Sequence, residues 1–303
     1  MQKFNRTYSL RVEVDPDLAD ALGLDEAFVE IALPFTLEFE ITRRLLTSAQ
    51  TGLFRIYNLG ENIRNALQKD YFQFTQIRAI QFRAGYDSFA GRFSALAFNG
   101  SVLTAYSYRQ DRDWITEIEA FDGGNQAANA DGVSITLSPN ITTAEVVRML
   151  SEQLPHTTGT PIIGNFPQKN LRGEVMFGNA WDLLIQKTNG QVTIDNGQVK
   201  ALNYNEVFNG EIPVISADTG LLGSPKRTRS TLEFDMIFEP RLTVGQIVLV
   251  ESLANRAYNR PWKVQGFNHR GTISPAVGGD CLTSVSLWFT VEDLKLVSGQ
   301  PVQ

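Results

Sequence analysis

The stretch GLLGSPKRTRSTLEFDMIFEPRLTVG, residues 220–245, carries the clearest local signals in the chain. Leu232, Phe234, Met236 and Phe238 alternate with polar residues, and such a period of two predicts a β-strand with one buried face. Glycine tolerates positive φ and proline fixes φ, so these residues on either side of the strand suit tight turns. The candidate corner residues are Gly220, Gly223, Pro225, Pro240 and Gly245.

Three basic residues, Lys226, Arg227 and Arg229, stand together just before this strand. Such a cluster can bind phosphate, and PKRTR also resembles a nuclear import signal, although so short a run discriminates poorly. The chain as a whole has a formal net charge of −6, which argues against a general nucleic-acid-binding protein. We therefore expect a solvated loop first, a protein contact second and nucleic-acid binding last.

Composition predicts a folded protein of two or three domains: the chain has 303 residues, of which 43% are hydrophobic and 20% charged. Its single cysteine, Cys281, excludes an internal disulfide and suits assembly in a reducing cytoplasm. The N-terminus lacks the apolar segment of a signal peptide. No run of apolar residues is long enough to cross a membrane as a helix, so we expect no membrane association.

The first 121 residues are typical of a β-rich unit with one helix. Residues 35–41 alternate between apolar and polar side chains, and further strands are expected at 51–59, 74–87, 92–109 and 113–122. A helix is expected after the second of these strands, with Asn58 as its N-cap. The polar, aperiodic residues 122–132 then mark a domain boundary.

A small α/β domain is expected over 122–205. One helix starts with the capping box of Thr142 and Glu145, and a second is capped by Asn179. The pair Asn196–Gly197 predicts a hairpin with a type I′ turn. The chain then returns to strands over 206–303, which gives a β, α/β, β order without a repeat that is visible in the residues.

Motifs for catalysis, metals and cofactors give no support to an enzyme. The two histidines, His156 and His269, stand in no metal-binding motif, and the chain has no G-x-S-x-G elbow, P-loop or dinucleotide fingerprint. We therefore expect no catalytic residue, cofactor or metal. The 33 acidic residues leave open a pair of carboxylates for acid/base chemistry, as in a peptidoglycan hydrolase, but a solvated strand face is the simpler interpretation. The four tryptophans are expected in the core.

The order of features in 220–245 resembles the C-terminal barrel of the baseplate hub proteins of long-tailed bacteriophages. The family segment G-[LM]-[IL]-G-x-P-x-x-T matches from Gly220 to Thr228, followed by a strand, a turn ending in proline and an entry into the next strand. This chain departs from the family at Glu239, where asparagine is common, and at Ser230–Thr231, where glycine is common. Residues 52–70 and 177–202 resemble the first hub barrel and the small α/β module of that family.

The resemblance implies a mainly β protein with α+β elements, in which two β-barrel domains, 1–121 and 206–303, flank a small α/β domain, 122–205. It also implies a non-enzymatic homotrimer that forms a pseudo-six-fold ring in the baseplate of the virion. The ring would join the hexameric tail tube to a trimeric central spike, contact baseplate wedge or tape-measure proteins, and let DNA pass transiently through an acidic lumen. We expect the spike to be a separate polypeptide, because the second barrel ends near Gln303.

Two alternatives remain at this point. A tail-tube initiator or distal tail protein uses similar barrels and would form hexamers, and a tail-associated peptidoglycan hydrolase would act on cell walls. In the hub interpretation, Lys226, Arg227 and Arg229 are candidate assembly contacts, and the corner residues shape the barrel without doing chemistry.

Overall fold

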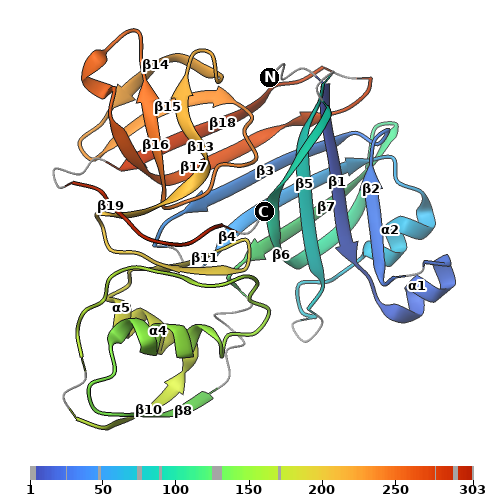
Figure 1. Ribbon diagram of the computed structural model, residues 1–303. Helices are drawn as coiled ribbons and strands as arrows, with labels where there is room; N and C mark the ends of the chain where they lie inside the picture. Colours follow the sequence, from blue (N-terminus) through green and yellow to red (C-terminus); the bar gives the residue numbers. More distant parts are fainter. Residues whose placement is uncertain are drawn as a thin grey trace.

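The computed structural model of the protein describes residues 5–24, 26–46, 49–73, 77–88, 91–124, 132–169, 172–276, 278–288 and 293–301. The described chain is mainly β with a few short helices, which confirms the predicted fold class. Figure 1 shows two strand-rich parts side by side and a smaller mixed part below them. None of the described helices has the length and hydropathy needed to span a membrane.

The first strand-rich part is built from antiparallel strands with two short helices at one side. Its elements are β1 (Asn5–Glu13), α1 (Pro16–Leu22), β2 (Phe28–Ala32), β3 (Leu37–Arg44), β4 (Gln50–Tyr57), α2 (Glu61–Leu67), β5 (Ala79–Ser88), β6 (Gly91–Gln110) and β7 (Asp113–Asp122).

The mixed part pairs two helices with short strands. Its elements are β8 (Gly132–Leu137), α4 (Thr143–Ser151), β9 (Ile162–Ile163), β10 (Glu174–Asn179), α5 (Ala180–Thr188), β11 (Val192–Asp195) and β12 (Gln198–Ala201). The second strand-rich part consists of β13 (Glu206–Ser216), β14 (Leu221–Arg227), β15 (Thr231–Ile237), β16 (Gln246–Glu251), η1 (Arg256–Tyr258), β17 (Pro261–Ile273), β18 (Cys281–Trp288) and β19 (Lys295–Leu296).

One sheet runs through both strand-rich parts. Its main path is β14-β15-β18-β17-β3-β4-β7-β6-β5-β1-β2, and the two parts meet where β17 pairs antiparallel with β3. Gly266 lies opposite Arg44 at one end of this pairing, and Ile273 lies opposite Leu37 at the other. The two parts are therefore joined by a backbone ladder (Figure 1).

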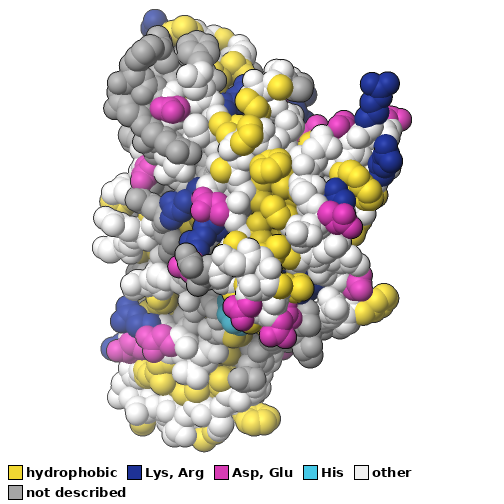
Figure 2. All heavy atoms as spheres, turned by 90° about the vertical axis from the view of Figure 1, so that its right-hand side faces the viewer, with side chains coloured by type: hydrophobic (Ala, Val, Ile, Leu, Met, Phe, Trp, Pro, Cys, Tyr) yellow, Lys and Arg dark blue, Asp and Glu magenta, His cyan; other side chains and the backbone are white. Residues whose placement is uncertain are grey.

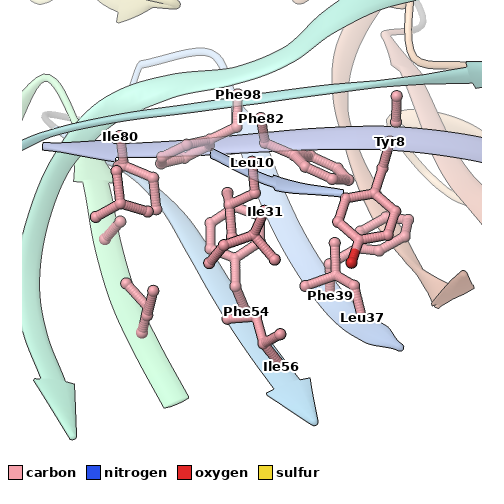
Figure 3. Packing of buried hydrophobic residues seen from close by; sticks show 14 of the residues in the cluster. Tyr8, Leu10, Ile31, Leu37, Phe39, Phe54, Ile56, Ile80, Phe82 and Phe98 are labelled. Carbon is pink, nitrogen blue, oxygen red and sulfur yellow. The ribbon is translucent and has the colours of Figure 1, made fainter. Parts of the chain in front are cut away.

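In the described chain, each of the three parts has a large hydrophobic core, and a fourth, small cluster contains Ile162, Leu202 and Phe208. The first is rich in aromatic residues: the Phe82 ring lies 5.0 Å from Phe39 and 5.3 Å from Phe54 between centroids (Figure 3). Phe238 and Ile273 from the second strand-rich part also belong to this first core. The predicted boundaries after 121 and 205 stay predictions, and residues 125–131 of the predicted linker lie outside the described chain.

The helices cover one side of the first core. Figure 2 shows a band of hydrophobic side chains on this side of the molecule, flanked by acidic and basic ones. Leu22 of α1 and Ile63 of α2 are half-buried and pack against the first core.

Local capping signals had mixed success. The capping box of Thr142 and Glu145 is confirmed, and Asn179 caps α5 by accepting from the backbone N–H groups of Trp181 and Asp182. The prediction that Asn58 caps a helix was wrong: α2 begins after Gly60, and Asn58 has φ of 60°. Its side chain instead accepts from the Trp114 backbone N–H and donates to Asp113, so it links the end of β4 to the start of β7.

Two tryptophans depart from the prediction of a buried set: Trp288 is half-buried and stacks on the exposed Tyr204, and Trp114 lies at the surface. Trp114 is 37% exposed, and the Arg64 guanidinium lies 4.0 Å from its ring. A cation over an indole face is favourable at a surface position, which explains why this ring needs no core.

Candidate assembly surface and buried junction

The basic residues lie at the edge of the large sheet. Lys226 and Arg227 belong to strand β14, and Arg229 lies in the turn that leads to β15; all three side chains are exposed. The expectation of a loop was therefore wrong for Lys226 and Arg227. Lys226 lies opposite Glu233 of β15, so part of the basic charge faces an acidic cross-strand neighbour.

The candidate corner residues occupy two separate places. Gly220 (φ 111°), Gly223 (φ 66°) and the buried Pro225 lie at the start and along β14, which carries a bulge between Leu222 and Lys226. Pro240 and Gly245 (φ 84°) lie after β15, where Gly245 approaches Leu202 of the mixed part. The positive φ values explain the glycines, because other residues adopt this conformation at a cost.

The glycines differ in the space around them, which predicts that they differ in how well they tolerate substitution by alanine. A Cβ at Gly245 would lie 2.8 Å from Leu202 Cδ1 and 3.2 Å from Phe208 Cε1, whereas a Cβ at Gly223 would meet nothing within 4 Å. We expect Gly245→Ala to lower the free energy of unfolding by about 2–4 kcal/mol, from backbone strain plus overpacking, and Gly223→Ala by about 1 kcal/mol from strain alone. Urea unfolding of both variants measures the difference, and equal losses would contradict it.

A buried ionic cluster, the junction cluster, joins all three parts of the chain. Its charged members are Arg43 of β3, Asp122 of β7, Asp195 of β11 and Lys200 of β12, each at most 2% exposed. Arg43 Nη1 donates to Asp195 and lies 3.3 Å from Asp122 Oδ2. Lys200 Nζ and Thr243 Oγ1 each lie 2.6 Å from Asp195 Oδ2. Two cations and two carboxylates thus link the first part to the mixed part, and Thr243 connects the second strand-rich part to them.

The predicted hairpin turn of the mixed part is the element that enters this cluster. Asn196 (φ 54°) and Gly197 (φ 75°) have the positive φ values of a type I′ turn. Their backbone N–H groups donate to Asp122, with 2.9 Å from Gly197 N to Asp122 Oδ1. The Asn196 side chain accepts from Arg43 and from the Asn99 backbone N–H. The turn therefore docks the mixed part onto the first sheet.

The two carboxylates of the cluster differ in pKa. Burial alone would raise the pKa of Asp195, but Lys200 and Arg43 outweigh it and hold that pKa below its usual range. Burial raises the pKa of Asp122 to about 6, against the attraction of Arg43. The four side chains are closed off from solvent, and their contacts link the parts of the chain.

His269 lies beside this cluster in the core. Its ring is fully buried between Phe267, at 4.5 Å, and Phe238, at 5.1 Å, and Nδ1 lies 2.8 Å from Thr283 Oγ1. Burial, with a smaller contribution from the Arg43 charge, lowers the pKa of His269 to about 3. The residue packs as a core histidine.

This shift predicts a pH dependence of stability. The pKa of His269 is near 6.5 in the unfolded chain and about 3 in the folded protein, so the unfolded chain binds the proton first as the pH falls. The contribution of His269 to the free energy of unfolding is therefore present above pH 6.5 and is lost as the pH falls toward 3. Relative to His269→Gln, we expect the wild type to lose about 2 kcal/mol of unfolding free energy between about pH 7 and pH 5. Urea titrations of both proteins at each pH measure this, and a constant difference would contradict a neutral buried imidazole.

The sheet face that points away from the cores is polar and spans both strand-rich parts; we call it the outward sheet face. Among the charged residues that paired registers place on it are Glu38, Glu40, Glu117, Glu119, Glu233 and Asp235, with Arg44, Arg55, Lys226 and Arg270. Part of this face is a groove between β14 and β3 that includes Arg44, Glu233 and Asn268. In this set of residues, carboxylates outnumber basic side chains.

One carboxylate of this face, Glu117, is bonded in a way that does not suit a general acid. Glu117 accepts from Arg55 and from the Tyr106 hydroxyl, at 2.6 Å each. Burial opposes the shift, but these two hydrogen bonds lower the pKa of Glu117. A general acid at neutral pH needs a raised pKa, so Glu117 gives the hydrolase alternative no support.

Sequence reasoning missed the junction cluster although a signal was present. Arg43 continues the buried phase of Leu37, Phe39 and Ile41 in β3, so the alternation places its guanidinium in the core. A charged residue in a buried phase needs partners of opposite charge. Asp195 and Lys200 flank the predicted turn in the same hairpin.

These features define the class: a structural protein in which a sheet spans two strand-rich parts that a buried ionic cluster fastens together. The fold is shared with a 43 kDa tail protein of prophage MuSo2 from Shewanella oneidensis (TM-score 0.56, 8% identity, 92% of this chain and 96% of that chain). It is also shared with a tail protein from Neisseria meningitidis MC58 (TM-score 0.54, 12% identity, 94% and 97%). A chain of the half-lidded Francisella PdpA–VgrG complex matches with TM-score 0.54 and 8% identity, over 98% of this chain and 60% of that chain.

The sequence itself places the chain more narrowly. The family model described as baseplate hub gp41 matches residues 19–270, so the chain belongs to the baseplate hub gp41 family. A search of curated proteins gave no match. The resemblance seen in 220–245 is thereby confirmed, and the protein is a structural hub component of a phage tail baseplate.

Proposed function

We propose that three copies of this chain form a ring with near-six-fold symmetry that adapts a hexameric tail tube to a trimeric central spike. The observation that carries the proposal is a repeated strand arrangement within one chain. In the first part, hairpins β3–β4 and β6–β7 give the order β3-β4-β7-β6. In the second part, hairpins β14–β15 and β17–β18 give the order β14-β15-β18-β17. Three chains therefore supply six similar four-stranded units.

The outward sheet face is suited to line the opening of such a ring. It is continuous over both units, polar, and weakly acidic in the set of residues named above. An acidic wall repels the phosphate backbone of DNA, so DNA would pass without being retained. This supports transient passage of DNA through the lumen, and it makes DNA binding by Lys226, Arg227 and Arg229 a minor expectation.

The partners follow from the same arrangement. One rim of the ring would contact the tail tube protein and the other the central spike, with wedge or tape-measure proteins around or inside it. The likeness in fold to chains in VgrG complexes and phage tail proteins is consistent with a place in a tail assembly of the virion. The single, buried Cys281 is compatible with assembly in the host cytoplasm.

Measuring the mass and symmetry of the purified ring tests the proposal. Light scattering at high protein concentration should give a trimer, and class averages of negatively stained particles should show three-fold symmetry with six similar lobes. A hexamer would instead support a tail-tube initiator or distal tail protein. A stable monomer at every concentration, with no ring in the presence of a tube or spike partner, would overturn the proposal.

A further inference from the structure

The large sheet has two strand edges that could continue it into a neighbouring molecule. In the described chain, β14 pairs with β15 alone and stands at one end of the sheet path. Strand β6 pairs with β5 only as far as Ser101, and then runs on beside β7 to Gln110. Beyond Ser101, on the side of β6 away from β7, the Val102 N–H donates to the Arg78 carbonyl oxygen, and Ala105 exchanges two backbone hydrogen bonds with Lys69. Within the described chain, the open edge of β6 is therefore residues 106–110. An unpaired edge is a template for another strand.

The two four-stranded units match each other over most of their paired positions, apart from a register shift of β14 that β3 lacks. Strand β6 shifts register against β7 between Val102 and Thr104, and β17 shifts against β18 between Val264 and Gly266. Aligning these bulges makes β6 equivalent to β17 and β3 equivalent to β14. Phe54 opposite Ile118 then corresponds to Phe234 opposite Val285, and all four are buried. The units are therefore structural repeats, although no repeat is visible in the sequence.

Inside the chain, these units are joined last strand to first strand: β17 of one unit pairs antiparallel with β3 of the other. The equivalent free strands are β6 and β14. We propose that β6 of one copy pairs antiparallel with β14 of the next copy, so that the sheet continues from chain to chain in the way it continues within the chain. The inference deepens the proposed ring by naming its contact surface, and it relies on that ring only for the number of copies.

The internal pairing also supplies the register of the contact. Within the chain, Arg270 lies opposite Glu40. Tyr108 is equivalent to Arg270 by the aligned bulges. Lys226 lies opposite Glu233 and Glu40 lies opposite Leu53, the residues that precede the equivalent Phe234 and Phe54. Lys226 is therefore equivalent to Glu40. Tyr108 of one copy is thus expected opposite Lys226 of the next.

Charge and backbone chemistry fit this register. On the first unit, the face beside Tyr106 and Tyr108 carries Glu117 and Glu119 of β7, and the incoming strand brings Lys226 onto the same face. Glu117 and Glu119 lie one strand beyond β6, so their charges attract Lys226 at longer range, and such complementarity favours the correct register over wrong ones. Pro225 has no N–H to donate, so the ladder is expected to stop there. The basic residues of β14 thereby acquire a role at a subunit contact.

The backbone directions tell which pair of side chains lies closest. Both main-chain groups of Ala105 bond to Lys69 on the free side of β6, so those of Tyr108 point toward β7. The Thr228 N–H donates to Thr231 of the β14–β15 hairpin, so the main-chain groups of Lys226 point toward β15. Tyr108 and Lys226 would therefore form a non-hydrogen-bonded pair with Cα atoms about 4.5 Å apart, which a disulfide can span.

Disulfide trapping tests the contact in the full-length chain. The variant Tyr108→Cys/Lys226→Cys is oxidised at high protein concentration and run on a non-reducing gel. We expect most of the protein in linked species, in a ladder that ends at three chains. Within one chain, seven strand steps separate the two positions, roughly 34 Å along the sheet, so the bond must join two copies.

Matched controls exclude chance linkage. Each single-cysteine variant and Tyr108→Cys/Arg227→Cys, whose second cysteine points to the opposite face of β14, should stay unlinked. The wild type controls for the buried Cys281. A three-fold ring seen by microscopy without linkage at 108/226 would overturn the strand pairing and leave the ring standing. Linkage in a ladder beyond three chains would support the pairing and overturn the trimer, and absence of both linkage and ring would overturn both.

Discussion

Replacing Arg43 with methionine should lower the free energy of unfolding by about 3–5 kcal/mol, the effect typical of removing one partner from a buried ion pair. Arg43 is 1% exposed and its guanidinium contacts Asp122 and Asp195. Without it, two buried carboxylates would have Lys200 as the remaining cation of the junction cluster. The measurement is chemical denaturation monitored by tryptophan fluorescence.

The neighbouring Arg44→Met is the matched control, because Arg44 is exposed and points to the outward sheet face of the same strand. Arg44→Met is expected to lower the free energy of unfolding by less than about 1 kcal/mol. Arg43→Lys should not rescue stability fully, because an ammonium group cannot reach Asp122, Asp195 and the Ala97 carbonyl together as the guanidinium does. Equal losses for Arg43→Met and Arg44→Met would show that the cluster does not hold the parts together.

The elements that sequence patterns predicted are those set by neighbours along the chain. Alternation predicted most strands, and the capping box of Thr142 and Glu145 and the turn at Asn196–Gly197 were found from adjacent residues. These signals act over a few positions, where backbone sterics and local hydrogen bonds decide the conformation. Asn58 failed because its side chain bonds across the sheet to Trp114 and Asp113, which no local rule registers.

The candidate site was harder to predict because it depends on contacts between distant segments. The pairing of β17 with β3 brings Asn268 to Thr42, at 2.9 Å between Nδ2 and Oγ1, across more than two hundred residues. No residue near Asp122 in the sequence indicates that its carboxylate accepts a hydrogen bond from the Asn196 backbone N–H. Lys226 and Arg227 were noticed as charges, but only the sheet order shows that they stand at an edge.

The second large effect is expected at Phe238, which belongs to the second strand-rich part but lies in the first core. Its ring is fully buried, 5.3 Å from Phe39 and 6.5 Å from Tyr86 between centroids. The Tyr86 hydroxyl donates to the Phe238 carbonyl oxygen at 2.7 Å. Truncation to alanine removes a large buried ring from between the two parts, so we expect a loss of about 3–5 kcal/mol in the free energy of unfolding.

Phe234→Ala is the matched control, because Phe234 lies in β15 and is buried in the second part's own core. Both variants should be destabilised, but hydrogen exchange measured by mass spectrometry should separate them. In Phe238→Ala the loss of protection should reach β3 and β5 of the first part, whereas in Phe234→Ala it should stay with β14, β15 and β18. Unchanged protection of β5 in Phe238→Ala would mean that the β17–β3 ladder alone sets the angle between the two units. Loss of protection of β5 in Phe238→Ala would mean that side-chain packing also sets the angle between the two units, as the proposed ring requires.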